Sequence, residues 1–406
     1  MLRRRSALLA AGLAALLAGS AGATPAGATP ASATPAGANI TADATRADAT
    51  RGDATRADAA RGDATRADAA RGDAGRAADA RGDAVRAADA RGDGARGDVG
   101  VGGDVGAFAG VADGYASVNA LGINGTTGGA AGPTVTVTTA AQLAQYAGAN
   151  TPYTILISGR IQVSGLVRVV ANKSILGLGT TAEITGGGFV LGSTTRPGNN
   201  VIIRNITFRD ASDDSVSVHN GAHHVWIDHN DFYPAYDGSL DIKHKSTFVT
   251  VSWNRFHGTD KSMLLGHSDT YTADIGYLKV TYHHNLFDRS TQRHPRARFG
   301  DPVHVYNNYY RGVGSYGVAS TENAGLLVEA NYFEDTAFPC HSASGYAESA
   351  PGRLAQRGNA FVRSGACETN GTVGDPGAYY AYQADSATSV PSLVTAGAGV
   401  GRITVP

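Results

Sequence analysis

The chain has 406 residues and balances 34 basic side chains against 35 acidic ones, which leaves a formal net charge of −1. This balance argues against a generally basic protein that binds nucleic acid. No stretch after the N-terminus reaches the roughly 18 consecutive apolar residues of a membrane-spanning helix, so we expect contacts with neither nucleic acid nor membrane.

The first 23 residues have the three parts of a secretory signal peptide. Arginines at positions 3–5 form a positive region, residues 7–17 an apolar stretch, and the small residues 21–23 a cleavage site. We therefore predict that residues 1–23 are removed during export and that the mature protein is secreted and extracellular.

Residues 24–103 differ in composition from the rest of the chain. An Ala/Thr/Pro stretch is followed by pentads such as ADATR and GDATR, each with one Asp, one Arg and almost no apolar side chain. Because such units cannot offset their ordering entropy by burial, we predict a disordered linker. The pentads also create Arg-Gly-Asp triplets, for example at 51–53, which we interpret as a by-product of the repeat rather than as adhesion motifs.

Residues 104–406 are long enough for one large domain, and a pattern repeats within them. A short β-branched stretch, an asparagine and an aromatic residue recur, as in VTVSWNRF (249–256). The closing aromatics follow one another at intervals of 23 to 31 residues: Phe208, Phe232, Phe256, Phe287, Tyr310, Phe333 and Phe361. Strand-like stretches at this period indicate a solenoid. We predict an all-β fold, a right-handed parallel β-helix whose coils stack strands about 4.8 Å apart.

The repeated polar and aromatic residues have a structural use in such a fold. The aromatic rings would stack inside, while asparagine amides would hydrogen-bond from coil to coil: Asn205, Asn230, Asn254, Asn285, Asn308 and Asn331. The chain has two cysteines, Cys340 and Cys367, separated by 27 residues, which is close to one coil. In an exported protein this favours a disulfide between neighbouring coils.

Ionisable side chains occupy similar positions on four consecutive coils. Counted from the closing aromatic of its coil, each lies five or six residues further on: Asp214, Asp237, Lys261 and Arg293. Asp241 follows Asp237 by four residues, so both side chains point to the same side of a strand. Stacked coils would therefore place acids beside bases in one column.

Three carboxylates within two coils repel one another unless a cation lies between them. Calcium fits best, because it is a hard cation that prefers oxygen ligands. Lys261 and Arg293 suit an anionic ligand, whose carboxylate would bridge the metal and the basic groups. Arg298 follows Arg293 by five residues and is placed to assist it, whereas Arg296 has no assigned role.

Apart from Asp214, these residues lie in three of four motifs: VWIDH (225–229), DGSLDIK (237–243), HGTDKSMLLGHSD (257–269) and RHPRARFG (293–300). In this order they resemble the signature blocks of pectate lyases of polysaccharide lyase family 1. The opening block VNALGINGTTGG and the closing block VTAGAGVG are similar to that family too. The likeness covers about residues 104–406.

The resemblance implies a calcium-dependent enzyme that cleaves polygalacturonate by β-elimination. Carried over by position, Asp214, Asp237 and Asp241 would bind calcium, with Asp213 as the alternative to Asp214. The aspartate of VWIDH, Asp228, we interpret as structural.

The resemblance also assigns the basic residues. Lys261 and Arg298 would bind substrate carboxylates, and Arg293 would be the catalytic base that removes the C5 proton. Since a guanidinium normally keeps its proton up to a pH of about 12, we expect activity at alkaline pH.

Three other functions fit the sequence less well. A pectin lyase acts on methyl-esterified polymer without calcium, and the three aspartates argue against it. A hydrolase would need clustered acids for attack by water, whereas here bases face the acids. A non-catalytic carbohydrate-binding or adhesive solenoid would leave the charged column without a use. We expect a monomer whose partner is polygalacturonate.

Overall fold

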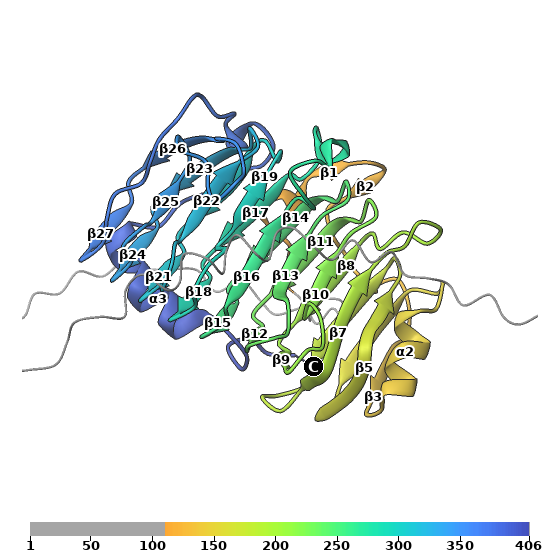
Figure 1. The fold of residues 1–406 in the computed structure, drawn as a ribbon. Helices are drawn as coiled ribbons and strands as arrows, with labels where there is room; N and C mark the ends of the chain where they lie inside the picture. Colours follow the sequence, from red (N-terminus) through yellow and green to blue (C-terminus); the bar gives the residue numbers. More distant parts are fainter. Residues whose placement is uncertain (1–109, 406) are drawn as a thin grey trace, which may run out of the picture. The chain divides into compact units, whose positions relative to one another are not determined.

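The computed structural model describes residues 110–405, so the predicted signal peptide and linker lie outside the described residues. The described part is a parallel β-solenoid in which each strand pairs with the equivalent strand of the next coil (Figure 1). The expected all-β, right-handed parallel β-helix is confirmed.

Three strand stacks run along the solenoid, and we call them the first, second and third sheets. The first sheet contains β5 (Arg160–Val169), β7 (Glu183–Leu191), β10 (Val216–Val218), β13 (Gly238–Ile242), β16 (Lys261–Leu265), β19 (Arg296–Arg298), β22 (Val318–Thr321) and β25 (Cys340–His341). The second sheet contains β9 (Thr207–Arg209), β12 (Asp231–Phe232), β15 (Arg255–His257), β18 (Leu286–Asp288), β21 (Tyr309–Arg311), β24 (Tyr332–Glu334) and β27 (Ala360–Val362). The first two sheets are continuous, because β7 pairs with β9 in its first half and with β10 in its second half.

The third sheet contains β3 (Thr134–Val137), β4 (Tyr153–Ile157), β6 (Lys173–Gly177), β8 (Val201–Arg204), β11 (His223–Asp228), β14 (Thr247–Ser252), β17 (Val280–His283), β20 (Val303–Tyr306), β23 (Gly325–Glu329) and β26 (Arg353–Arg357). Two short strands, β1 (Asn119–Ala120) and β2 (Ile123–Asn124), form a separate antiparallel pair. Short 3-10 helices occur at Gly114–Ser117, Thr272–Asp274, Pro376–Ala378 and Ala387–Ser389.

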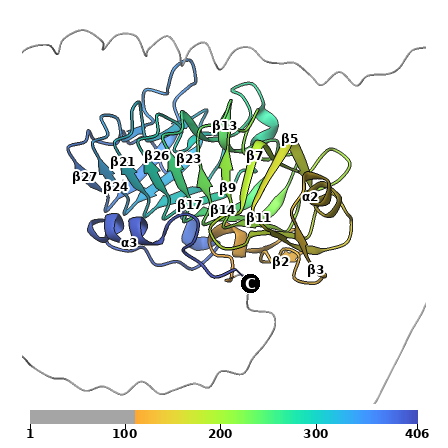
Figure 2. The same ribbon diagram turned by 90° about the horizontal axis from the view of Figure 1, so that it is seen from below.

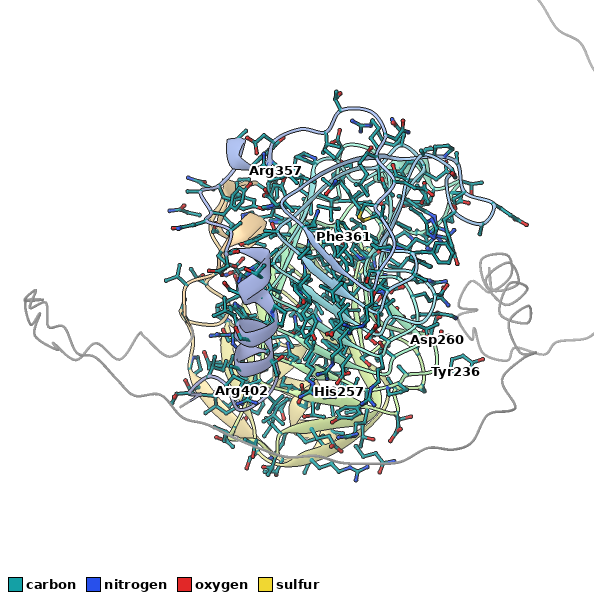
Figure 3. All side chains as sticks on the ribbon, turned by 90° about the vertical axis from the view of Figure 1, so that its left-hand side faces the viewer. Tyr236, His257, Asp260, Arg357, Phe361 and Arg402 are labelled. Atoms are coloured by element: carbon teal, nitrogen blue, oxygen red, sulfur yellow. A yellow bond between two sulfur atoms is a disulfide. The ribbon has the colours of Figure 1, made fainter. Side chains whose placement is uncertain are left out.

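The predicted aromatic stack fills the interior along the second sheet. Successive ring centroids from Phe208 to Phe361 lie 4.3 to 5.3 Å apart, and all six contacts are stacked. Seen from the β27 end (Figure 3), Phe361 lies within the cross-section, whereas Tyr236 and Asp260 each lie toward its outer edge. The rings therefore bury the inside of each coil and leave the charged residues on the outside.

The asparagine ladder is confirmed for five of the six predicted residues. From Asn230 onward, each side-chain Nδ2 donates to the Oδ1 of the next asparagine at 3.0 or 3.1 Å, as far as Asn359. Asn205 bonds to the neighbouring coil as expected but stands outside this chain of amides. It lies three residues before Phe208 instead of two, and its Nδ2 donates to the carbonyls of Gly177 and Gly179.

Helices cover one end and one side of the solenoid. Helix α2 (Ala140–Ala147) lies at the end near β3 and β5, and α3 (Val390–Gly397) lies along the side (Figure 2). The predicted disulfide between Cys340 and Cys367 is confirmed. Within residues 110–405, no helix has the length and apolar character needed to cross a membrane.

Candidate active site

The predicted site residues lie where four neighbouring strands of the first sheet begin. Asp214 shortly precedes β10, Asp237 precedes β13, and Lys261 is the first residue of β16. Arg293 lies on the turn that leads into β19. Since parallel neighbours begin at the same edge of a sheet, the fold brings these four residues of distant sequence onto adjacent coils.

The strand register differs by one residue from the column that the sequence predicts. The β13–β16 pairing puts Gly238 opposite Lys261. Continued by two residues, the β10–β13 pairing puts Asp214 opposite Gly238 as well. Asp237 therefore lies one place before this row, and its carboxylate reaches Lys261 diagonally, with 3.1 Å between Oδ1 and Nζ.

The carboxylates form one acidic cluster around Gly238. Asp213, Asp214 and Asp237 each offer an oxygen within 4.8 Å of the others. Asp214 and Asp241 are 3% and 4% exposed. A Cβ on Gly238 would lie 3.0 Å from Oδ1 of Asp214 and 2.9 Å from Oδ1 of Asp241. The glycine thus leaves space between two buried carboxylates, and their oxygens are the ligands that a hard cation prefers.

Charge repulsion within this cluster is strong enough to affect its titration. Burial, followed by the neighbouring carboxylate of Asp241, raises the pKa of Asp214 to about 7. Lys243 opposes this, because its Nζ lies 3.2 Å from an oxygen of each aspartate. Burial lowers the pKa of Lys243, but the two carboxylates outweigh it and raise that pKa above its ordinary value. The cluster therefore favours bound positive charge.

Arg298 lies on β19 with a buried guanidinium that is only partly paired. Its Nε donates to the carboxylate of Asp269, whereas its Nη1 has no hydrogen-bond partner among residues 110–405. Burial, and then the neighbouring charge of Arg296, lower the pKa of Arg298. A buried donor without a partner is costly, so Nη1 is a point at which an anionic ligand would gain a hydrogen bond.

Arg293 is held by a buried histidine that the sequence prediction did not include. Arg293 is 5% exposed, with a left-handed φ of 64°, and its carbonyl accepts a 2.7 Å hydrogen bond from the amide of Met263. The ring of His294 lies 2.9 Å from the carbonyl of Tyr316 and 2.8 Å from the hydroxyl of Ser290. Burial lowers the pKa of His294 to about 4, so a neutral ring fixes the backbone beside Arg293.

A segment from the last coils covers the arginines on β19. In residues 342–351, the hydroxyl of Ser349 lies 2.8 and 2.9 Å from the two oxygens of Asp269. The same hydroxyl accepts a 2.8 Å hydrogen bond from Nη2 of Arg296, and the ring of Tyr346 lies 5.3 Å from that guanidinium. Arg296, which had no role in the sequence prediction, holds this segment in place.

A family model described as pectate lyase matches residues 73–403 of the chain. The chain belongs to the pectate lyase family. The expected polysaccharide lyase class is thereby confirmed.

Curated relatives agree with this assignment. A pectate trisaccharide-lyase of Bacillus licheniformis is 36% identical over 312 residues, which span 71% of this chain and 86% of the relative. A pectate trisaccharide-lyase of Thermotoga maritima is 35% identical over 336 residues, with coverage of 71% and 88%. A solved pectate lyase from Bacillus sp. N165, in complex with trigalacturonate, is 32% identical with a TM-score of 0.63, and covers 72% of this chain and 100% of its own.

The sequence prediction for this pectate lyase missed several residues, and only some of them leave a signal in the sequence. Lys243 follows Asp241 by two residues and directly follows the end of β13, so the alternation of side chains could have placed both on one face. His294 and Ser349 act through contacts with other coils, for which the local sequence holds no signal. Asp228 is structural as predicted: it binds the side chains of Arg204, His229 and Ser252.

The charged residues of the predicted site lie apart from a cavity at the turns of the first sheet. A cavity of about 450 Å³ lies at the turns after β19 and β22, where Phe299, Glu322 and Arg353 contribute to its lining. None of the predicted site residues lines this cavity. The predicted site residues therefore lie apart from this cavity, where strands of the first sheet begin.

Proposed function

We propose that this pectate lyase is a secreted, calcium-dependent enzyme that cleaves α-1,4-linked polygalacturonate by β-elimination and releases 4,5-unsaturated products. The observation that carries the proposal is the space at Gly238 between the carboxylates of Asp214 and Asp241, with Lys261 opposite Gly238 on the neighbouring strand. The names of the relatives and the trigalacturonate complex support this substrate class.

Calcium fits the donor set of the acidic cluster. Asp214, Asp237 and Asp241 supply carboxylate oxygens, and Asp213 is close enough to replace or join them. Bound there, calcium would neutralise charge that develops on a substrate carboxylate. Secretion is supported by the signal-peptide pattern of residues 1–23.

The chain's own residues divide the reaction between binding and proton transfer. Arg293 would take the proton from C5 of the uronate, whose carboxylate then receives the carbanion-like charge. Lys261 and the free Nη1 of Arg298 would hold that carboxylate and stabilise this charge. The electron pair of the broken C5–H bond forms the C4–C5 double bond, and the C4–O bond breaks with its pair on oxygen.

Product formation tests the proposal directly. Purified protein should generate unsaturated product that absorbs ultraviolet light from polygalacturonate at alkaline pH with calcium, and a chelator should abolish the signal. Absence of product under these conditions would contradict the lyase assignment. Activity that survives the chelator, with a preference for methyl-esterified polymer, would favour a pectin lyase instead. The mass of the secreted protein would show whether residues 1–23 are removed.

A further inference from the structure

Arg168 is an exposed cation on the face of the sheet that carries the active site. It lies in the second half of β5 between two core valines, so its side chain points away from the interior. Across the strands, Arg168 lies opposite Val190, which lies opposite Ser217, which lies opposite Asp241. Three strand spacings, roughly 14 Å, therefore separate Arg168 from the acidic cluster along one row.

The side chain of Arg168 has no hydrogen bond or ion pair to any residue in the described part of the chain. Arg160, on the same strand, instead forms an ion pair with Glu183, with 3.1 Å between Nε and Oε1. The charge of Arg168 also acts on the active-site region: burial lowers the pKa of His219 to about 4, and Lys243 and Arg168 both contribute. Arg168 and Lys243 thus both act on His219, and the guanidinium of Arg168 has no ion-pair partner among the described residues.

Nothing large separates Arg168 from the acidic cluster in this row. Val190 and Ser217 occupy the two intervening positions, and both side chains are short. The strands β5, β7, β10 and β13 lie side by side (Figure 1). An extended anion bound at the cluster could therefore continue across them toward β5.

The opposite direction along the sheet is covered. There, Ser349 and Tyr346 of the segment 342–351 lie against the arginines of β19, and Arg298 is 2% exposed. Toward β5, the row ends at the exposed side chain of Arg168, and the buried side chains of Val190 and Ser217 form the floor between it and the acidic cluster. A polymer that reacts beside Arg293 could thus extend over this floor toward β5.

We propose that Arg168 binds the carboxylate of a uronate residue several sugars away from the cleaved bond, so that the substrate lies across the strands from β19 toward β5. This inference rests on the proposed function. A guanidinium recognises a carboxylate through charge-assisted hydrogen bonds, and a methyl ester would remove that charge. Arg168 would accordingly favour long, unesterified chains.

Kinetics on substrates of two lengths test the assignment. The variant Arg168→Ala should raise KM for polygalacturonate about tenfold, the lower end of what a hydrogen bond to a charged group contributes, with kcat nearly unchanged. KM for trigalacturonate, which is too short to reach β5 from β19, should stay at the wild-type value. Arg168→Lys should restore part of the loss, because it returns the charge without the planar donor pair.

Arg160→Ala is the matched control, since it removes an exposed arginine from the same strand without facing the row. Equal KM values for wild type and Arg168→Ala, or an equal rise in Arg160→Ala, would overturn the inference. A measurement of equilibrium binding of polygalacturonate distinguishes a failure of the role of Arg168 from a failure of the proposed lyase function. Wild-type protein that binds the polymer but forms no product contradicts the lyase activity, whereas equal Kd values for wild type and Arg168→Ala contradict the role of Arg168.

Discussion

Gly238 lies between the carboxylates of Asp214 and Asp241 and has no side chain to fill the space between them. The space matters because burial and mutual repulsion raise the pKa of Asp214 to about 7, so a bound cation would relieve an unfavourable arrangement. Lys243 already supplies one positive charge from the side of β13. At the scale of single residues, the proposed calcium site therefore depends on one missing side chain as much as on the acids.

Gly238→Ala should weaken calcium binding. The added methyl group would lie about 3 Å from two carboxylate oxygens, so the acids must move apart, and we expect a calcium affinity lower by about tenfold to a hundredfold. Calorimetric titration with calcium measures this. Gly314→Ala is the control, because its Cβ would meet nothing closer than 3.7 Å. Unchanged affinity in Gly238→Ala would place the calcium site elsewhere.

Arg293→Lys tests the base. A lysine keeps a positive charge but places its nitrogen differently, so we expect kcat to fall by about a hundredfold or more, with polygalacturonate binding retained. Arg289→Lys on the same coil, where the side chain is 81% exposed, should behave as wild type. Near-normal turnover in Arg293→Lys would exclude Arg293 as the base.

Among the elements of the fold, the repeat was the most predictable part. Aromatic residues that must stack inside every coil leave a period in the sequence, and this period predicted the strands of the second sheet. The spacing failed by one residue at Asn205, although the turn that holds Asn205 is as long as the equivalent turn of the next coil. It also failed at Asp237, because the turn from Phe256 to Lys261 is one residue shorter than the turn from Phe232 to Gly238. The role of His294 and the covering segment around Ser349 could not be predicted, since their partners lie 22 to 80 residues away.

Asn254→Ala should destabilise the solenoid. Nδ2 of Asn254 donates to the carbonyl of Ile227 and to Asn285, and its Oδ1 accepts from both nitrogens of Asn230. Alanine would leave several buried groups without partners, at a cost of about 3 kcal/mol or more in the free energy of unfolding. The midpoint of unfolding should therefore move to a lower denaturant concentration. Asn359→Ala, at the partly exposed end of the ladder, should cost less because water replaces the amide. An equal loss in both variants would argue against a buried ladder.

At the scale of the whole domain, segments near both ends of the described chain form hydrogen bonds to the same sheet. Near the start, the amide of Tyr115 donates to the hydroxyl of Thr281, and near the end that hydroxyl lies 2.7 Å from the hydroxyl of Tyr380. Near the same end, Tyr382 donates a hydrogen bond to Glu329 on β23. Segments far apart in sequence thus hold strands β17 and β23 of the third sheet, on a different strand stack from the charged site.

We expect the stabilisation that the hydrogen bonds of Glu329 provide to decrease at acidic pH. Burial alone would raise its pKa, but hydrogen bonds from His304, Arg357 and Tyr382 lower it to about 2. Since the unfolded carboxyl has the higher pKa, the unfolded state binds more protons, and the stabilisation present above pH 4.5 is lost as pH falls toward about 2. The free energy of unfolding of Glu329→Gln should therefore lie below that of wild type at pH 6, and the gap should close on acidification. The exposed Asp210→Asn should show no such gap, and a Glu329→Gln gap that stays constant down to pH 2 would contradict this prediction.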